Sequence, residues 1–201
     1  MEAQEALPVY AVPTTRSSNY PTTPGAHDAS LGGLIDIVVT RLSADGSSLL
    51  GSTYVGGSAV DGANSPDGIS NTDPLQRNQN VNPLYKFYAD DSRGEVVLDT
   101  AGRAYVATCT RSTDFPGTVG SLQPTYGGGG QDGIVFRLSP DMSSLDWATY
   151  LGGTDYDAAF GIKRATTGDL YVCGGTASGT FPTTAGAYQS SYQGGLADGF
   201  L

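Results

Sequence analysis

Two segments of this sequence occur more than once, and this repetition restricts the fold more than any other feature. DIVVTRLSADGSSLLGSTYVGG begins at Asp36, and DGIVFRLSPDMSSLDWATYLGG begins 96 residues later at Asp132. A second phrase, of the kind AYVATCTRSTDFPGTVGS, occurs from Val9, Ala104 and Leu170. Repeats of this length indicate supersecondary units that bury their apolar faces against neighbouring units of the same kind.

The middle copy predicts four short antiparallel strands. Turn signals such as Ser139-Pro140-Asp141-Met142 separate runs rich in Val, Thr and aromatic residues. No stretch keeps the spacing of an amphipathic helix, so we expect an all-β protein. The strands are expected at 95–99, 103–110, 132–138 and 145–151. Four antiparallel strands in a repeat of about 66 residues are typical of a β-propeller blade.

The third strand of this copy carries apolar residues on both of its faces. Ile134, Phe136 and Leu138 alternate with Val135, and only Arg137 interrupts the pattern. A strand loses the simple alternation of polar and apolar residues when its sheet is buried on both sides. A blade pressed between two other blades is such a sheet. The pattern therefore favours a propeller, with a β-sandwich or a solenoid as alternatives.

Residues 104–153, 170–201 and, more loosely, 9–57 follow the pattern GxxYVxxxTxSxxFPTTxGAxQxxYxGGxxDGFxxRLSxDxSSLxxxTYLGG. This pattern resembles the bacterial β-propeller repeat known as SBBP. The resemblance implies a secreted or cell-surface bacterial protein in which the propeller is one module of a longer chain. It implies no enzyme activity, because no catalytic motif belongs to the repeat.

The repeats divide the chain into about two and a half blades. They predict a partial first blade without its innermost strand (1–57), an insertion loop (58–93), a complete blade (94–153) and a partial last blade (154–201). The last blade is expected to hold strands at 161–164 and 170–174. Because closed propellers use ~4–8 blades, we expect a part of a larger propeller. Other blades of a longer polypeptide, or a partner chain, would complete it.

The insertion between the first two blades is the main difference between the copies. A loop of this length is usually functional or disordered. It should emerge on the same face as the loops that carry Tyr20 and Phe115. Its aromatic and acidic residues are the candidate binding residues, unless the aromatic ones only hold the loop onto its own blade: Tyr85, Phe87, Tyr88, Asp90 and Asp91.

The charge of the chain argues against two classes of partner. The formal net charge is −10, which repels nucleic acid and anionic lipid surfaces. No run of about 18 apolar residues could insert into a membrane. We therefore expect neither nucleic acid binding nor membrane insertion.

Few residues in the sequence point to catalysis or to a metal. His27 is the single histidine and takes the place of Gln189 of the third copy, so it is expected in a surface loop. We predict no cofactor and no metal, although Asp61, Asp155 and Asp157 are weak candidates for calcium, which prefers oxygen ligands from loops. The two cysteines, Cys109 and Cys173, are expected as buried thiols, with a disulfide as the alternative.

These observations support two hypotheses of function. The first is a non-enzymatic, extracellular or cell-surface propeller segment that serves structural presentation, adhesion or protein–protein assembly. The alternative is a propeller that binds or cleaves carbohydrate, with glycans as partners and with Tyr88, Asp90 and Asp91 in the site.

Overall fold

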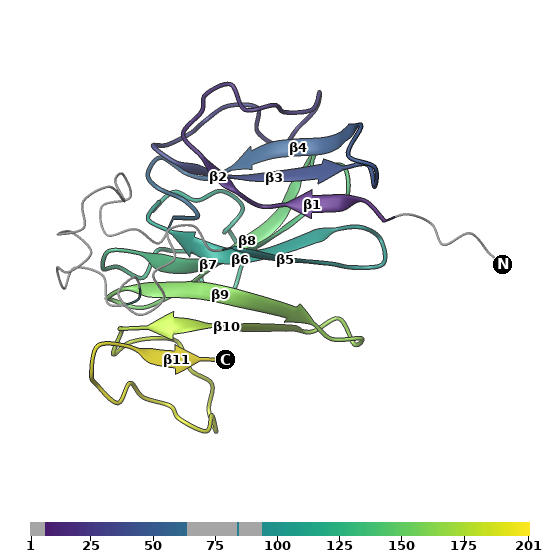
Figure 1. Ribbon diagram of the computed structural model, residues 1–201. Coiled ribbons are helices and arrows are strands. Elements are labelled where there is room, and N and C mark those ends of the chain that lie inside the picture. Colours follow the sequence, from purple (N-terminus) through teal and green to yellow (C-terminus); the bar gives the residue numbers. More distant parts are fainter. Residues whose placement is uncertain (1–6, 64–83, 85–93) are drawn as a thin grey trace.

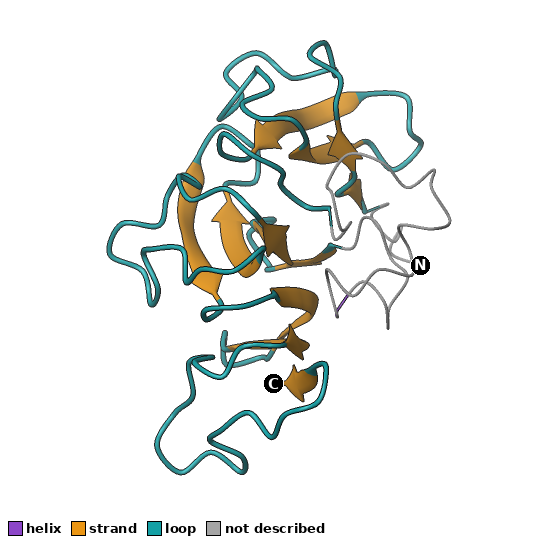
Figure 2. Ribbon diagram, turned by 90° about the vertical axis from the view of Figure 1, so that its left-hand side faces the viewer, coloured by secondary structure: helices purple, strands orange, loops and turns teal. Residues whose placement is uncertain are grey.

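A computed structural model describes residues 7–63, 84 and 94–201, which form three antiparallel β-sheets (Figure 1). The first sheet holds β1 (Val9–Ala11), β2 (Thr14–Thr15), β3 (Asp36–Leu42) and β4 (Leu49–Val55). The middle sheet holds β5 (Glu95–Leu98), β6 (Ala104–Thr110), β7 (Asp132–Leu138) and β8 (Leu145–Leu151). The third sheet holds β9 (Asp157–Arg164), β10 (Leu170–Thr176) and β11 (Asp198–Phe200). Figure 2 shows the sheets turned by 90°, with long loops flanking the strands. The prediction of an all-β protein is confirmed.

The strands of the middle copy lie where the sequence predicts them. The third and fourth strands have the predicted bounds, and the first two differ by a single residue at one end. In the third sheet β9 begins at Asp157, four residues before the predicted start. The extra residues include Ala158 and Ala159, which pair with Gly175 and Gly174 of β10. Alanine and glycine are poor strand formers, so the pattern gave no signal there.

A proline divides one strand of the first sheet in two. Both β1 and β2 pair with β3, through Val9 opposite Leu42 and Thr14 opposite Ile37. Pro13 lies between them and has no N–H to donate to the ladder, although its carbonyl accepts the N–H of Val38 at 2.9 Å. Together β1 and β2 take the place that β6 holds in the middle sheet.

The middle sheet is buried on both faces. Towards the first sheet, fully buried residues of the middle sheet pack in one cluster with Ile37 and Val39. Towards the third sheet, Tyr105 and Val135 pack in a second cluster with Ile162. The residues of β6 and β7 on the first of these faces are Ala104, Val106, Ile134, Phe136 and Leu138. The expectation that the sheet of this third strand is buried on both faces is confirmed.

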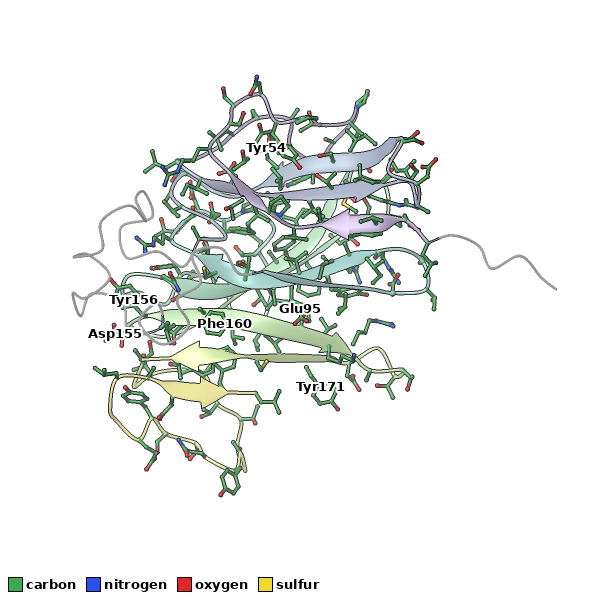
Figure 3. All side chains as sticks on the ribbon, viewed as in Figure 1. Tyr54, Glu95, Asp155, Tyr156, Phe160 and Tyr171 are labelled. Carbon is green, nitrogen blue, oxygen red and sulfur yellow. The ribbon has the colours of Figure 1, made fainter. Side chains whose placement is uncertain are left out.

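Equivalent residues mediate the two junctions between sheets. At the first junction the Tyr10 hydroxyl donates to the carbonyl of Gly102 at 3.2 Å. At the second, Tyr105 occupies the equivalent position and the guanidinium of Arg164 lies 5.8 Å from the centroid of its ring. Glu95 adds a hydrogen bond across this junction, because its Oε2 accepts the N–H of Ile162 at 2.8 Å (Figure 3). Each sheet thus contacts the next with the same face.

In the part of the chain that the structure describes, no sheet closes on itself. The arrangement of the described residues is therefore three stacked antiparallel sheets, and their interpretation as propeller blades stays a prediction. Within the same described ranges, no helix is long and apolar enough to cross a lipid bilayer.

The Gly-Gly pairs that end β4 and β8 allow consecutive copies to approach closely. A Cβ atom on Gly153 would lie 2.7 Å from Ser178 Cβ and 2.9 Å from the backbone nitrogen of Phe181. On Gly57 it would lie 2.6 Å from Ser112 Cβ. No real Cβ contact is that short, so only glycine fits at these two points.

We predict that Gly153→Ala destabilises the protein by about 2 kcal/mol, because the added methyl group overpacks the junction. The matched control is Gly179→Ala, whose Cβ would have no neighbour within 4 Å and should change the free energy of unfolding by less than about 0.5 kcal/mol. Urea unfolding of both variants gives these values. Equal stability of the two variants would show that the junction is not closely packed.

Candidate functional site

A long loop wraps the fourth strand in the first and middle sheets, and a buried tyrosine holds each loop. In the middle sheet the Tyr150 hydroxyl donates to the carbonyl of Ser112 at 2.8 Å and accepts the N–H of Phe115 at 3.0 Å. Burial raises the pKa of Tyr150 to about 12, so the hydroxyl keeps its proton. The side chain is 1% exposed. Its hydroxyl therefore satisfies two backbone groups that water cannot reach.

The first sheet repeats this arrangement with its own residues. The Tyr54 hydroxyl donates to the carbonyl of Ser17 at 2.6 Å and accepts the N–H of Tyr20 at 2.8 Å. The sequence matched Tyr54 to Tyr150, and the structure shows that both make the same pair of hydrogen bonds. The shared tyrosine is therefore the residue that joins loop and strand in each copy.

A second set of hydrogen bonds fixes the register between loop and strand. In the middle sheet the N–H of Gln123 donates to Thr149 Oγ1 at 3.0 Å, and the N–H of Tyr150 donates to the carbonyl of Gln123 at 3.1 Å. In the first sheet Asp28 makes both of these hydrogen bonds, at 2.9 and 3.0 Å. The sequence comparison had placed His27 at this position and was wrong by one residue, because the first loop is one residue shorter.

The corresponding loop of the third sheet, residues 177–197, borders an open groove of about 530 Å³. We call it the third-loop groove. Its lining includes the residues that lie 66 positions after the loop residues named above: Ser178, Phe181 and Gln189. Further lining residues are Tyr188, Tyr192, Asp198, Gly199, Phe200 and Leu201. The groove is thus built from the parts that enclose a strand in the other two copies.

The outer face of the third sheet is a second exposed surface. Tyr171 is 55% exposed and lies at the periphery of the molecule (Figure 3), whereas its equivalent Tyr105 is 6% exposed between two sheets. Cys173 is exposed as well, although its equivalent Ala107 is fully buried. We call this surface, with Tyr171 and Cys173, the outer tyrosine face. It is the face that the first and middle sheets use to contact the next sheet.

The expectation of two buried thiols was therefore half wrong. The two cysteines form no disulfide with each other, and Cys109 is buried whereas Cys173 is exposed. Cys173 is exposed because no described residues cover the face of β10 that carries it.

Two pairs of carboxylates lie at the junctions between sheets. Asp36 Oδ1 and Asp61 Oδ2 both lie 2.8 Å from the point where a Cβ on Gly56 would be. Asp132 and Asp157 approach Gly152 in the same way at the second junction. All four side chains are at most 1% exposed. The aspartate before the third strand accepts backbone N–H groups in each of the three copies, through Asp36, Asp132 and Asp198.

The second aspartate of each pair connects consecutive copies. Asp61 Oδ2 accepts the N–H of Gly57 and the hydroxyl of Ser112, both at 2.8 Å. Asp157 Oδ2 accepts the N–H of Gly153 at 2.7 Å and the hydroxyl of Ser178 at 2.6 Å. Each carboxylate thus joins the end of one sheet to the loop of the next.

Burial of these carboxylates raises their pKa values. The pKa of Asp132 is raised to about 7, mainly by desolvation and in smaller part by the charge of Asp157, against one hydrogen bond from Gly127 that lowers it. Desolvation likewise raises the pKa of Asp61 to about 6, although the hydroxyls of Thr110 and Ser112 lower it. The pKa values of Asp36 and Asp157 are raised for the same reason. Proton binding to these four carboxylates therefore favours the folded protein.

The structure does not bring the three calcium candidates together. Asp61 and Asp157 lie at different junctions, and Asp155 is exposed beside the second one. Among the described residues no group of three or more acidic, histidine or cysteine side chains gathers in metal-binding geometry. The buried carboxylate pairs are also closed to a sugar substrate, because glycine backbone covers them.

The residues assigned to the insertion surface lie outside the described residues. These are Tyr85, Phe87, Tyr88, Asp90 and Asp91. The preceding residue, Leu84, is described and is fully buried with Cys109, Ala158 and Phe160. The sequence reasoning concentrated on this insertion and missed the third-loop groove and the outer tyrosine face. The 66-residue offset was a partial signal, because it identifies the equivalents of the middle copy's residues but not their exposure.

No protein-family model matches this chain, and a search of the curated proteins finds no similar one. The functional argument therefore depends on the geometry of the described residues.

We predict that Tyr150→Phe lowers the free energy of unfolding by about 1–3 kcal/mol, because it leaves the buried backbone groups of Ser112 and Phe115 without their shared partner. Tyr188→Phe is the matched control, since Tyr188 is fully exposed. Its effect should be within about 0.5 kcal/mol. Denaturant unfolding monitored by circular dichroism measures both. An unchanged free energy of unfolding for Tyr150→Phe would show that these two hydrogen bonds do not stabilise the loop.

We predict that stability falls as the pH rises from about 4.5 to 7. The pKa of Asp132 is near its ordinary value of 3.8 when unfolded and about 7 when folded, so the folded state binds more protons in this range. Asp132→Asn should reduce the dependence of the free energy of unfolding on pH, by up to about 1.4 kcal/mol per pH unit for one proton. Asp45→Asn is the control, because the hydrogen bonds of Ser43 hold the pKa of that exposed carboxyl at about 2. Parallel profiles of the wild type and Asp132→Asn would contradict this prediction.

Proposed function

We propose that this chain is a segment of a β-propeller that acts as a non-enzymatic scaffold for protein assembly, outside the cell or at the bacterial cell surface. The outer tyrosine face carries the proposal. Tyr10 and Tyr105 both lie at junctions where one sheet packs on the next. Tyr171 is the third member of this series and is 55% exposed. A face that packs on a sheet in two copies is suited to pack on a sheet in the third.

The opposite end of the stack offers a matching surface. Val9 is 49% exposed and Ala11 is exposed, whereas their equivalents Ala104 and Val106 are fully buried against the first sheet. The outer tyrosine face of one stack and the Val9 face of another therefore have the chemistry of the two surfaces that already meet inside the chain. Such a contact joins two different surfaces head to tail, which produces either a closed ring or an open array.

The partner of this face is accordingly a further blade of the same kind. Blades of a longer polypeptide, a second copy of this chain and a blade of another protein share this chemistry. The resemblance to the SBBP repeat supports the extracellular location, since the family consists of secreted and cell-surface proteins.

We predict that Tyr171→Glu prevents association of this chain, because it places a charge at the centre of the outer tyrosine face. The wild type should associate as its concentration rises, and its Cys173 should react more slowly with a maleimide in the associated state. Tyr188→Glu is the control, because Tyr188 is exposed on a loop. Sedimentation velocity and the labelling rate report the result. A wild-type chain that remains monomeric, with labelling independent of concentration, would contradict the assembly role.

A further inference from the structure

We propose that Met142 and Gly51 select which sheet packs on the first sheet. Met142 belongs to the hairpin turn between β7 and β8, and Gly51 lies in β4 of the preceding copy. The two residues meet at the junction between the first and middle sheets. The inference concerns recognition between sheets within the chain, and it holds whether or not the outer tyrosine face takes part in assembly.

Met142 has a backbone conformation that its residue type rarely adopts. Its φ is 62°, and within the ranges that the structure describes no other residue except glycine has a positive φ. The N–H of Met142 donates to the carbonyl of Ser139 at 3.0 Å, as Gly46 does to Ser43 at 2.8 Å in the first copy. Gly46 has a φ of 70°. The turn therefore favours glycine, and a side chain at this position needs a compensating gain.

The compensating gain is burial against the first sheet. Met142 is fully buried and packs in one cluster with Ile37, Val39 and Val55. Removing a methionine side chain from water is a favourable contribution of the size that offsets one strained residue. The side chain at the tip of the turn thus contacts the sheet before it.

Gly51 provides the space that Met142 occupies. A Cβ atom on Gly51 would lie 3.0 Å from Met142 Cγ and 3.0 Å from the carbonyl oxygen of Asp141. Contacts this short are rare for real Cβ atoms, so a larger residue at this position of β4 would displace the tip of the turn. The side chain of Met142 and the missing side chain of Gly51 therefore fit each other.

Two hydrogen bonds hold the turn over Gly51. The N–H of His27 donates to the carbonyl of Met142 at 2.8 Å, and Arg41 Nη1 donates to the carbonyl of Pro140 at 2.9 Å. Both acceptors are backbone carbonyls, which every residue type offers. They position the turn but do not distinguish its sequence, so the selectivity comes from Met142 and Gly51.

The two copies differ at both positions of this pair. Gly51 lies opposite Arg41 in the first sheet, and the equivalent place opposite Arg137 in the middle sheet holds Trp147. A methionine cannot occupy the space over an indole ring as it does over a glycine. The first sheet thus accepts a turn that carries Met142, and a strand with tryptophan at this place excludes it.

Exclusion of a wrong neighbour gives a contact its specificity. Repeat proteins need this specificity, because assembly in the wrong order is a characteristic failure of chains with similar units. The pair therefore distinguishes the first and middle copies, although most of their other buried residues are alike.

Hydrogen exchange at one amide of each junction tests the proposal in the full 201-residue chain. The N–H of His27, which binds Met142, reports on the first junction. The N–H of Asp157, which donates to the carbonyl of Gln131 at 2.8 Å, reports on the second. Met142→Gly suits the φ of the turn but removes the buried side chain. It should lower the protection factor of His27 about tenfold and leave that of Asp157 unchanged.

A second substitution tests whether the two residues act as a pair. Gly51→Ala should lower the protection factor of His27 about tenfold in the wild type. In the Met142→Gly background the loss should be less than about threefold, because Met142 Cγ no longer opposes the added methyl group. Gly179→Ala is the control, since its Cβ would have no neighbour within 4 Å, and it should leave both amides unchanged in either background.

The outcomes are distinct. A loss confined to His27, together with the smaller effect of Gly51→Ala in the Met142→Gly background, supports the pair as the selector. Unchanged or higher protection of His27 in Met142→Gly overturns it, because Met142 would then be only a strained turn residue. An equal effect of Gly51→Ala in both backgrounds, or an equal loss at Asp157, overturns it as well.

Discussion

A sheet that is apolar on both faces has to be covered twice, and the rest of this structure depends on that constraint. Ile134 and Phe136 pack towards the first sheet, while Val135 of the same strand packs towards the third. Neither neighbour alone could remove both surfaces from water, which is the main favourable contribution to folding. The stack of sheets, the exposed face at its end and the open groove all follow from repeating such a unit.

Close contact between the copies depends on two residues that have no side chain. Gly57 and Gly153 have no side chain at the points where the next copy approaches. The gap admits Ser112 and Ser178 of the following loops. Asp61 and Asp157 accept the hydroxyl of these serines and the N–H of the same two glycines. Buried carboxylates usually oppose folding unless they are hydrogen-bonded or protonated. Hydrogen bonds satisfy both carboxylates, and burial raises their pKa values, so the same residues that join the sheets also make the joint sensitive to pH.

The repeats allowed most of the fold to be predicted, because equivalent residues had to occupy equivalent places. The bounds of β7 and β8 and the role of Asp132 could be predicted because turn residues and alternation mark them. The start of β9 could not, since alanine has little strand preference. The exposure of Cys173 was missed for another reason: parity places a residue on a face but does not say whether another sheet covers that face. The candidate site was expected in the insertion because the length of a loop can be read from a sequence, whereas the exposure of a residue cannot.

The capture of each fourth strand by its own loop has a consequence for the order of folding. Tyr150 finds its partners at Ser112 and Phe115, so the contacts that complete the middle sheet span fewer than about forty residues of one copy. Contacts this local form early and rapidly compared with pairings between distant segments. During synthesis the strands of each sheet can therefore pair once its own tyrosine has emerged from the ribosome, and the apolar faces are then buried as the next sheet packs on them.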